Sequence, residues 1–534
     1  MAALLIAPGL LHGELPHLFH VGGISARTAK VLCPGGRPTH EPLLWFGGPR
    51  RPPPRQLDLP WEPLLTTAEL RRGLAYYGSG ARLQALAAKL LAGQPIKVYA
   101  LGGSVTGGGG SSYPPATAYV SRFFRWINAT FPHRDHVFVN RAIPASTAFL
   151  FATCLSHHVP ADADLVTLEF TVNERKEAPF TSIERRAFEQ LLRRLLAYPG
   201  RPAIMMLHHY SWFESTGDGL NQGLYYAEPE SQLSTLAQFY DVPVLSVRAA
   251  VWRLMAAGAR HFRVNKVTLK DRTHRYLQNG TWLERTLPVS AQGPLAKLAF
   301  YYVDSLHPYD PGHQTLAELL VHPLVRAVRE VEAGESLGED DVRHAAELTG
   351  PDLPPPMIPG NVDEEPGACA LLGDFKGVVV ERQGFEYRPE RPNASEFRNQ
   401  KWGWTSSRPG SWAELEVDTQ QGSGHAEGDT LLWLSHLRSY AGMGTARAEC
   451  RDGCVCNSTT LDGTWEQRVS LFYMTRFPVS RHPRCRIRVT VSDQPGAYSA
   501  DNGHKVTLVG VMVTHVPLAG AGSLAAVQQL EFDV

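Results

Sequence analysis

The feature that most constrains the fold is a change of hydrophobic pattern at the Pro-rich stretch over residues 348–366. Before that stretch, short apolar runs alternate with longer amphipathic segments, and after it the helical period disappears. Continuously apolar strands between amphipathic helices are typical of a parallel sheet covered on both faces. Short strand-like runs separated by turn residues are typical of a β-sandwich. We therefore expect an α/β domain followed by an all-β domain.

The first domain is expected to contain five strands, over residues 96–101, 136–139, 165–170, 203–207 and 242–245. Its expected helices are residues 68–92 (interrupted at residues 78–80), 118–127, 183–197, 231–239 and 312–332. The second domain shows strand-like runs at residues 375–381, 413–417, 431–434, 469–472, 485–491 and 506–513. The expected organisation is a poorly ordered arm (1–65), an α/β domain (66–335), a Pro-rich linker (336–366) and a β-sandwich domain (367–534).

Charge and hydropathy exclude two classes of protein. The chain has 52 Lys plus Arg and 52 Asp plus Glu, so its formal net charge is zero. A nucleic-acid-binding protein needs clustered basic residues for phosphate, and this balance does not favour one. An apolar run of about 18 to 20 residues, the length that crosses a bilayer, is absent from the sequence. We therefore expect neither a nucleic-acid partner nor a transmembrane segment.

Four of the seven cysteines lie close together, at Cys450, Cys454, Cys456 and Cys485. Their spacing differs from the Cys-x2-Cys knuckles that bind zinc, so two disulfides are favoured over a metal site or free thiols. Four cysteines allow three pairings, and the sequence does not choose between them.

Four Asn-x-Ser/Thr sequons, at Asn128, Asn279, Asn393 and Asn457, agree with an oxidising compartment. The apolar N-terminus lacks the basic region of a secretory signal, and we interpret this as a true start that lies upstream or was mis-assigned. We expect a glycoprotein of the secretory pathway lumen or the extracellular space.

A serine follows the first expected strand in the segment Leu101-Gly-Gly-Ser104-Val-Thr-Gly-Gly-Gly-Gly110. Residues just after a buried parallel strand lie at the edge of the sheet where open α/β sheets bind ligands. A phosphate-binding loop is the alternative, but the segment lacks both the Gly-Lys-Ser/Thr and the Gly-x-Gly-x-x-Gly patterns of nucleotide sites. Ser104 is therefore a candidate nucleophile, with capping of a following helix as the competing interpretation.

Asp304 and His307 are three residues apart, directly before the last expected helix, in Tyr301-Tyr-Val-Asp-Ser-Leu-His-Pro-Tyr-Asp-Pro-Gly-His313. At that spacing the carboxylate can bind one imidazole nitrogen while the other nitrogen faces outward. This arrangement fixes the tautomer and raises the basicity of the imidazole, as a general base for a serine requires. A surface histidine and a helix-capping aspartate are the competing interpretations.

In these motifs, residues 70–335 resemble the SGNH (GDSL-like) hydrolase superfamily, whose members have a flavodoxin-like three-layer α/β/α fold. Gly102-Gly-Ser104-Val-Thr is similar to the first block of that family, with Gly103 where Asp is commonest, and Asp304 to Gly312 is similar to the last block. Glu169-Phe-Thr-Val-Asn173-Glu stands where many members have Gly-x-Asn-Asp. Asn140-Arg-Ala-Ile-Pro-Ala145 stands for Asn-x-Gly-x-x-Gly, without either glycine.

The resemblance implies a serine esterase that works through an acyl-serine, without cofactor or metal. Ser104 would be the nucleophile, His307 the general base and acid, and Asp304 the residue that orients His307. The oxyanion hole would use the backbone N–H groups of Ser104 and Ala145 and the side-chain amide of Asn173. Alanine keeps the backbone donor of the missing glycine, but a strained φ at that position would be costly. For Asn173, closing a turn at the end of a strand is the competing interpretation.

Other polar and aromatic residues have two interpretations each. The pair His208-His209 ends a strand near the same edge and either contacts substrate or has a structural role, and two histidines alone do not make a metal site. Asp310 and His313 are expected to cap or pack the last helix. The tryptophans Trp402, Trp404, Trp412, Trp433 and Trp465 could stack on sugar rings or pack within the β domain.

Three functions remain open from the sequence. The first is an esterase for small acyl esters, with O-acetyl groups on a glycan as the expected substrate, by analogy with two-domain SGNH-type proteins of walled eukaryotic cells. The second is an acyltransferase that uses the same acyl-serine with a sugar hydroxyl as acceptor. The third is a catalytically silent carbohydrate-binding or scaffold protein, which the altered positions Gly103, Ala142 and Ala145 would favour. Oligomeric state is not predicted.

Overall fold

The structure is a computed structural model. It describes residues 57–515 apart from residues 177, 215–228, 271, 279–280, 291, 336–337, 339, 341–342, 344–345, 349–352, 362–366, 394–399, 422–429, 466–469 and 500. The first 56 residues of the expected N-terminal arm, Cys33 and the sequon Asn279 lie outside this range.

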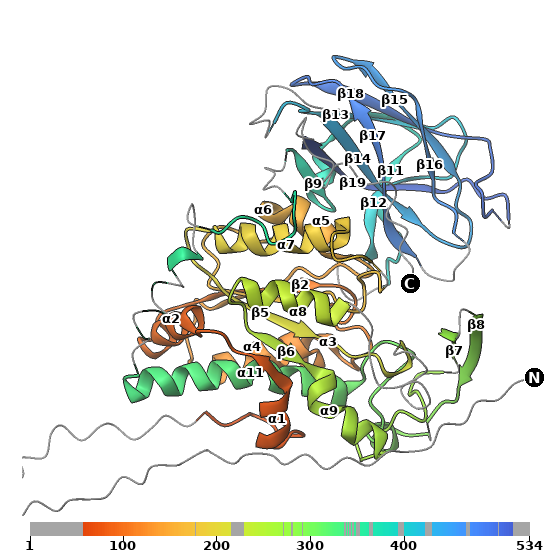
Figure 1. Ribbon diagram of the computed structural model, residues 1–534. Coiled ribbons are helices and arrows are strands. Elements are labelled where there is room, and N and C mark those ends of the chain that lie inside the picture. The colour runs from red at the N-terminus through yellow and green to blue at the C-terminus, as the bar shows by residue number, and fades with distance from the viewer. Residues whose placement is uncertain are drawn as a thin grey trace, which may run out of the picture. The chain divides into compact units, whose positions relative to one another are not determined.

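A six-stranded sheet forms the centre of the α/β part, in the order β1-β6-β5-β4-β2-β3 (Figure 1). The strands are β1 (Leu74–Tyr76), β2 (Lys97–Gly102), β3 (Val137–Asn140), β4 (Leu165–Glu169), β5 (Ala203–His208) and β6 (Val244–Ser246). Strands β2 to β6 pair in parallel, as predicted. A sixth strand that was not predicted, β1, pairs antiparallel with β6 at one edge.

Helices cover both faces of this sheet, and the strand residues alternate between the two faces. Val98 and Ala100 pack with α2 (Ala81–Leu91), α4 (Tyr119–Thr130), α9 (Val247–Ala256) and α11 (Asp310–Ala333). Tyr99 and Leu101 pack with α5 (Ala148–Thr153), α6 (Leu155–His158), α7 (Ile183–Leu196) and α8 (Pro229–Phe239) on the other face (Figure 1). Every residue of β4 and β5 is buried, which explains their largely apolar sequences.

Smaller elements complete this part of the chain. They are α1 (Thr67–Gly73), α3 (Pro114–Thr117), the 3₁₀ helix η1 (Trp212–Glu214), α10 (Pro294–Lys297) and the hairpin of β7 (Arg272–Gln278) and β8 (Thr281–Leu287). The helical pattern expected over residues 68–92 is interrupted at residues 78–80, as predicted. It is wrong at Leu74–Tyr76, which form β1 between α1 and α2. Gly93 has a φ of 68° just after α2, as expected for a residue that ends a helix.

Two antiparallel sheets that share one hydrophobic core make up the C-terminal part. One sheet has the order β10-β13-β18-β15-β16, and the other has the order β11-β12-β19-β14-β17 with β9 paired to β19. The elements are β9 (Cys369–Leu371), the 3₁₀ helix η4 (Asp374–Gly377), β10 (Val379–Gln383), β11 (Glu386–Pro389), β12 (Trp402–Ser406), β13 (Trp412–Val417), β14 (Thr430–Arg438), β15 (Thr445–Asp452), β16 (Thr459–Asp462), β17 (Leu471–Val479), β18 (Cys485–Val491) and β19 (Val506–His515). The prediction of an α/β domain with a largely parallel sheet followed by an antiparallel β domain is confirmed at this level.

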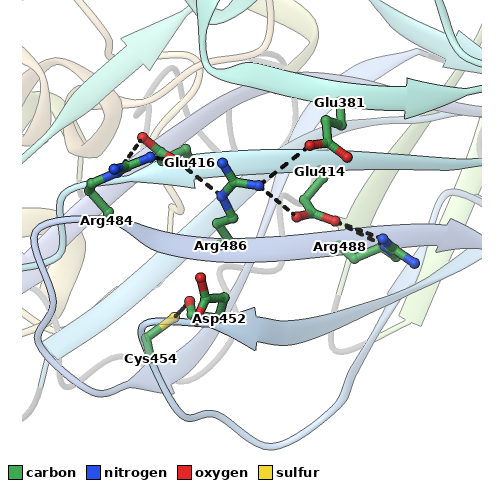
Figure 2. Close-up of polar contacts among 8 residues, drawn as sticks. All are labelled: Glu381, Glu414, Glu416, Asp452, Cys454, Arg484, Arg486 and Arg488. Carbon is green, nitrogen blue, oxygen red and sulfur yellow. Dashed lines mark hydrogen bonds and ion pairs between the residues drawn. The ribbon is translucent and has the colours of Figure 1, made fainter.

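Strands β13 and β18 show how the sequence pattern produces these sheets. Leu415 and Ile487 are paired across the two strands and point into the core, whereas their neighbours Glu414 and Arg488 pair on the outer face. Figure 2 shows Arg486 among three carboxylates. Its guanidinium lies 3.1 Å from Glu416, 3.5 Å from Glu381 and 3.6 Å from Glu414. The acidic and basic side chains of this face therefore form ion pairs across neighbouring strands.

The end of the expected N-terminal arm and part of the Pro-rich linker both pack on helices. In residues 57–65, Leu57 and Leu65 are buried, and the backbone N–H groups of Leu64 and Leu65 donate to the Glu318 carboxylate of α11. The expectation of a poorly ordered arm is therefore wrong for these residues. In the Pro-rich linker, Ile358 is buried and its N–H donates to Glu189 of α7.

The structure contains three disulfides. Cys450 is bonded to Cys456 and Cys454 to Cys485, which confirms that these four cysteines form two disulfides. The third, Cys154–Cys369, was not predicted, and it joins α/β and β parts that also share a hydrophobic cluster. None of the helices in the described residues is long and apolar enough to cross a membrane.

Candidate active site

Ser104 lies two residues beyond the end of β2, at the carboxyl edge of the parallel sheet. The residues that follow form turns, and the next helix, α3, begins only at Pro114. Ser104 therefore does not cap a helix, and this competing interpretation is wrong. Ser104 is half-buried, so its hydroxyl can be reached from solvent.

The imidazole of His307 lies directly against Ser104, although the two residues are 203 positions apart in the sequence. His307 Nε2 is 2.7 Å from Ser104 Oγ. On the opposite side of the ring, His307 Nδ1 lies 3.1 and 3.0 Å from the two carboxylate oxygens of Asp304. With the Nδ1 proton donated to Asp304, Nε2 is the nitrogen that accepts the hydroxyl proton of Ser104.

Asp304 is held in place by its own loop. Its Oδ1 accepts hydrogen bonds from the backbone N–H groups of Leu306 (2.9 Å) and His307 (2.8 Å). Burial alone would raise the pKa of Asp304, but the His307 imidazole and these hydrogen bonds hold it well below its ordinary value. The carboxylate is therefore ionised at any pH near neutrality, and it does not act as a helix cap, because α11 begins six residues later.

The two further candidates near the last helix hold the loop that carries Ser104. Asp310, the first residue of α11, accepts hydrogen bonds from the N–H (2.9 Å) and the hydroxyl (2.6 Å) of Ser112. Burial lowers the pKa of His313 to about 4, so its ring is neutral. His313 Nε2 donates to the carbonyl of Gly109 (3.0 Å) and its Nδ1 accepts from the N–H of Tyr119 (3.3 Å). Both residues thus connect α11 to the Gly-rich loop.

Asn173 lies four residues beyond the end of β4, and its side chain packs against Gly103, the residue that precedes Ser104. A Cβ atom added at Gly103 would lie 2.1 Å from Asn173 Oδ1. The backbone N–H of Asn173 donates to Phe170 in a turn (2.8 Å), whereas its buried Oδ1 has no hydrogen-bond partner among the described residues. The turn interpretation therefore accounts for the backbone of Asn173 and does not account for its side-chain oxygen.

Ala145 belongs to the segment that follows β3. This segment continues the pairing with β2, because Ile143 donates its N–H to the carbonyl of Gly102 at 3.0 Å. Ala145 has a φ of 58°, which is the left-handed region that favours glycine. Within the described residues, the N–H groups of Ala145 and Ser104 have no hydrogen-bond acceptor, so both are free to bind one.

Glu169, the last residue of β4, lies beneath the serine loop, and sequence reasoning did not identify it as functional. Its side chain is fully buried, and its Oε2 accepts a hydrogen bond from the hydroxyl of Thr106 (3.1 Å). That hydroxyl is 2.8 Å from the phenol oxygen of Tyr119. Burial raises the pKa of Glu169 to about 7. A single acidic residue at the end of an otherwise apolar strand was the only signal for it in the sequence.

The histidine pair at the end of β5 is structural. His208 is buried, with Nδ1 2.7 Å from the hydroxyl of Thr171 and Nε2 3.0 Å from that of Ser234. His209 is also buried and donates from Nε2 to the carbonyl of Leu306 (3.0 Å), in the loop between Asp304 and His307. These contacts agree with the structural interpretation of the pair, in which His209 supports the Asp304–His307 loop.

The remaining candidates lie in the β part. Trp404 and Trp433 are buried in hydrophobic clusters, which agrees with their interpretation as packing residues. Trp412 is half-buried, with the Arg488 guanidinium 4.1 Å from its ring centre. The sulfur atoms of Cys450, Cys454 and Cys485 lie within 4.8 Å of one another, but all of them are engaged in disulfides.

Comparison with known proteins shows a likeness of fold. The chain resembles the crystal structure of a two-domain esterase active on acetylated mannans, co-crystallised with mannopentaose, with a TM-score of 0.54 and 19% sequence identity. The match covers 84% of this chain and 98% of that one. A second crystal structure of a two-domain esterase active on acetylated mannans gives a TM-score of 0.54 at 18% identity, over 84% of this chain and 99% of that one. No protein-family model and no curated protein matches the chain.

Proposed function

We propose that the protein is an SGNH-type serine esterase that removes small acyl groups, and O-acetyl groups on carbohydrate in particular. The observation that carries the proposal is the chain of contacts from Ser104 through His307 to Asp304, at distances of 2.7 and 3.0 Å. A serine hydroxyl, an imidazole and a half-buried carboxylate in this order are the parts that acyl transfer requires. The two-domain fold shared with an esterase active on acetylated mannans supports an acetylated glycan as the substrate.

In the proposed reaction, His307 Nε2 takes the hydroxyl proton while Ser104 Oγ attacks the ester carbonyl. The protonated imidazole is stabilised by the Asp304 carboxylate and then gives its proton to the departing sugar oxygen, which leaves as a hydroxyl. This leaves an acetyl group on Ser104. In the second half of the reaction, water, deprotonated by the same imidazole, attacks the acyl-serine. The imidazole returns that proton to Ser104 Oγ as the bond to the acetyl carbon breaks, and acetate is released.

The negative charge of each tetrahedral intermediate needs hydrogen-bond donors close to Ser104. We assign this role to the N–H groups of Ser104 and Ala145 and to the side-chain amide of Asn173. Two observations support the assignment, namely the free N–H groups of Ser104 and Ala145 and the close approach of the Asn173 amide to Gly103. Each donor of this kind typically contributes about 10²- to 10³-fold to kcat.

Hydrolysis of p-nitrophenyl acetate by wild type, Ser104→Ala and His307→Ala tests the proposal. We expect both variants to lose at least about 10⁴-fold in kcat, because the members of such a triad act as a unit. A fluorophosphonate probe should label the wild type and not Ser104→Ala. Ser111→Ala, in the same loop, is the matched control and should still be labelled. Equal background rates and no labelling in all four proteins would show a catalytically silent protein and overturn the proposal.

Product analysis separates the esterase from the acyltransferase that uses the same acyl-serine. An acetylated glycan is incubated with the wild type, with and without an unacetylated acceptor glycan. Free acetate under both conditions supports the esterase. Acetyl groups on the acceptor in place of free acetate would show that a sugar hydroxyl, not water, reaches the acyl-enzyme.

The disulfides and sequons support a location in the secretory pathway or outside the cell. Disulfides persist in oxidising compartments and are rare in the cytosol. The sequon residues Asn128, Asn393 and Asn457 are all exposed, so a glycosyltransferase could reach them in the folded protein. A shift in electrophoretic mobility after treatment with peptide-N-glycosidase would test whether the protein expressed in eukaryotic cells is a glycoprotein.

A further inference from the structure

A polar cavity of about 570 Å³ lies beside the segment that follows β3. One wall consists of residues 140–143 with His157 and His158 of α6, and the other consists of residues 371–374 between β9 and η4. The two walls are held together twice. Cys154 and Cys369 form a disulfide next to the cavity, and His157 Nδ1 lies 2.8 Å from Asp374 Oδ2. The cavity is therefore bounded by structure that is fixed on both sides.

Two of the lining side chains have polar groups that the protein leaves unused. Arg141 is exposed, and its guanidinium has no hydrogen bond or ion pair with another described residue. His158 is 2% exposed, and its Nε2 has no hydrogen-bond partner in the described part of the chain. A buried polar atom without a partner is costly, which makes it a candidate for contact with a ligand.

Among the residues that line the cavity, Arg141 is the one cation that is not paired with a carboxylate. Burial lowers the pKa of His157 despite the neighbouring Asp374 carboxylate, and it lowers the pKa of His158 further. Both imidazoles are therefore neutral near pH 7. Asp374, the one acidic residue of the lining, is already hydrogen-bonded to His157.

A free guanidinium beside a histidine matches one chemical group well. The planar fork of arginine donates two parallel hydrogen bonds to a carboxylate, and these charge-assisted bonds are stronger than bonds to neutral hydroxyls. His158 adds a donor in its Nε2–H tautomer. We propose that this cavity is a subsite for the carboxylate of an acidic sugar unit, so that the protein acts on acylated glycans that contain uronic acids.

The position of the cavity connects it to the candidate active site. Arg141 donates its N–H to the carbonyl of Ala100 in β2 (2.9 Å), four residues before Ser104. Asn140, also in the wall, donates from its side chain to the carbonyl of Thr106, two residues after the serine (2.7 Å). The segment that lines the cavity therefore also supports the serine loop. The link between this subsite and ester hydrolysis rests on the proposed function, but binding of the acidic sugar does not.

Direct binding tests the subsite without turnover. Trigalacturonate and a neutral galactose trisaccharide are titrated into the full-length protein in a calorimeter. We expect the wild type to bind the acidic trisaccharide at least about tenfold more tightly, because bonds to a charged group are stronger. Arg141→Gln should lose this difference. Arg134→Gln removes an arginine with 92% of its side chain exposed, just before β3 begins, and should keep it.

The preference for the acidic ligand decides the result. Equal affinity of the wild type for the two trisaccharides, or an undiminished preference in Arg141→Gln, would overturn the subsite. Thermal unfolding of each variant shows whether Arg141→Gln is folded, and Arg141→Lys, which keeps the charge without the fork, provides a second variant. We expect Arg141→Lys to retain part of the preference.

Kinetics with acetylated oligosaccharides that do or do not contain a uronic acid then connects the subsite to catalysis. The wild type should have the higher kcat/KM for the acidic oligosaccharide, and Arg141→Gln should bring the two values together. Tight binding of trigalacturonate without hydrolysis of either oligosaccharide would support the acidic-sugar site and contradict the esterase. Hydrolysis of both at equal rates, with equal binding, would support the esterase and contradict the subsite.

Discussion

Gly103 and Asn173 occupy the same small space at the carboxyl edge of the sheet, since a Cβ atom at residue 103 would lie 2.1 Å from Asn173 Oδ1. The resembled family most often has Asp at this position. A side chain at residue 103 would therefore displace the Asn173 amide. Glycine at this position is thus compatible with an active site.

Gly103→Ala should lower kcat for p-nitrophenyl acetate by about 10²- to 10³-fold, which is the usual effect of losing one oxyanion donor. The added methyl group cannot coexist with the present position of Asn173, so the amide must move. If the glycine acts through Asn173, the double variant Gly103→Ala/Asn173→Ala should be no slower than Asn173→Ala alone.

Gly377→Ala is the matched control for this substitution, because a Cβ atom there meets nothing within 4 Å. It should hydrolyse the substrate at the wild-type rate. An unchanged kcat in Gly103→Ala would show that the position of the Asn173 amide does not matter for the reaction.

Ala145→Gly should stabilise the protein by up to about 1 kcal/mol. Alanine at a φ of 58° carries the strain of the left-handed region, which glycine avoids. The gain is partly offset because glycine gives the unfolded chain more freedom. Urea unfolding measures the difference. The control is Ala142→Gly, at a buried residue of the same segment that does not have a positive φ. It should destabilise the protein by about 1 kcal/mol. A similar loss of stability in Ala145→Gly would show that Ala145 is not strained.

The sequence predicted the elements whose pattern is local. The strands β4 and β5 were predicted because they are mostly apolar and bounded by polar turns. Helix α5 was not found, because all six of its residues are buried and it therefore has no amphipathic period. The edge strand β1 was merged into a helix because its three residues are defined by pairing with β6, which is a tertiary interaction.

The same distinction holds for the candidate site. Asp304 and His307 share one short motif, and Ser104 follows a recognisable strand, so the resemblance to a family could bring them together. The supporting residues Glu169, His209 and Asp310 have no spacing of their own, and only the folded structure shows which backbone groups they bind. The unused side chains of Arg141 and His158 were invisible for the same reason.

Glu169 should make the stability of the protein depend on pH between about 4.5 and 7. In the unfolded chain the carboxyl loses its proton near its ordinary pKa of 4.5, whereas burial in the folded protein raises that pKa to about 7. The unfolded state thus binds fewer protons in this window, and the free energy of unfolding falls as the pH rises, by about 3 kcal/mol in total. Above pH 7 the contribution is constant.

Glu169→Gln removes this titration and is compared with the wild type by urea unfolding at pH 5 and pH 7.5. Relative to the wild type, the variant should gain about 2 kcal/mol of stability between pH 5 and pH 7.5, because part of the total change already occurs below pH 5. Glu386→Gln, at an exposed position of β11, should show the same pH dependence as the wild type. Parallel curves for Glu169→Gln and the wild type would mean that the carboxyl titrates normally in the fold.

The disulfide Cys154–Cys369 should contribute more to stability than Cys450–Cys456. The first closes a loop of 215 residues and the second a loop of 6. In the chain-entropy model, closing these loops in the unfolded state is worth about 5 and about 2 kcal/mol, respectively. The double variants C154A/C369A and C450A/C456A should lose free energy of unfolding in that order, as measured by urea titration under identical conditions. Equal losses would show that the long disulfide does not act by restricting the unfolded chain, and that local packing around the cysteines determines its effect.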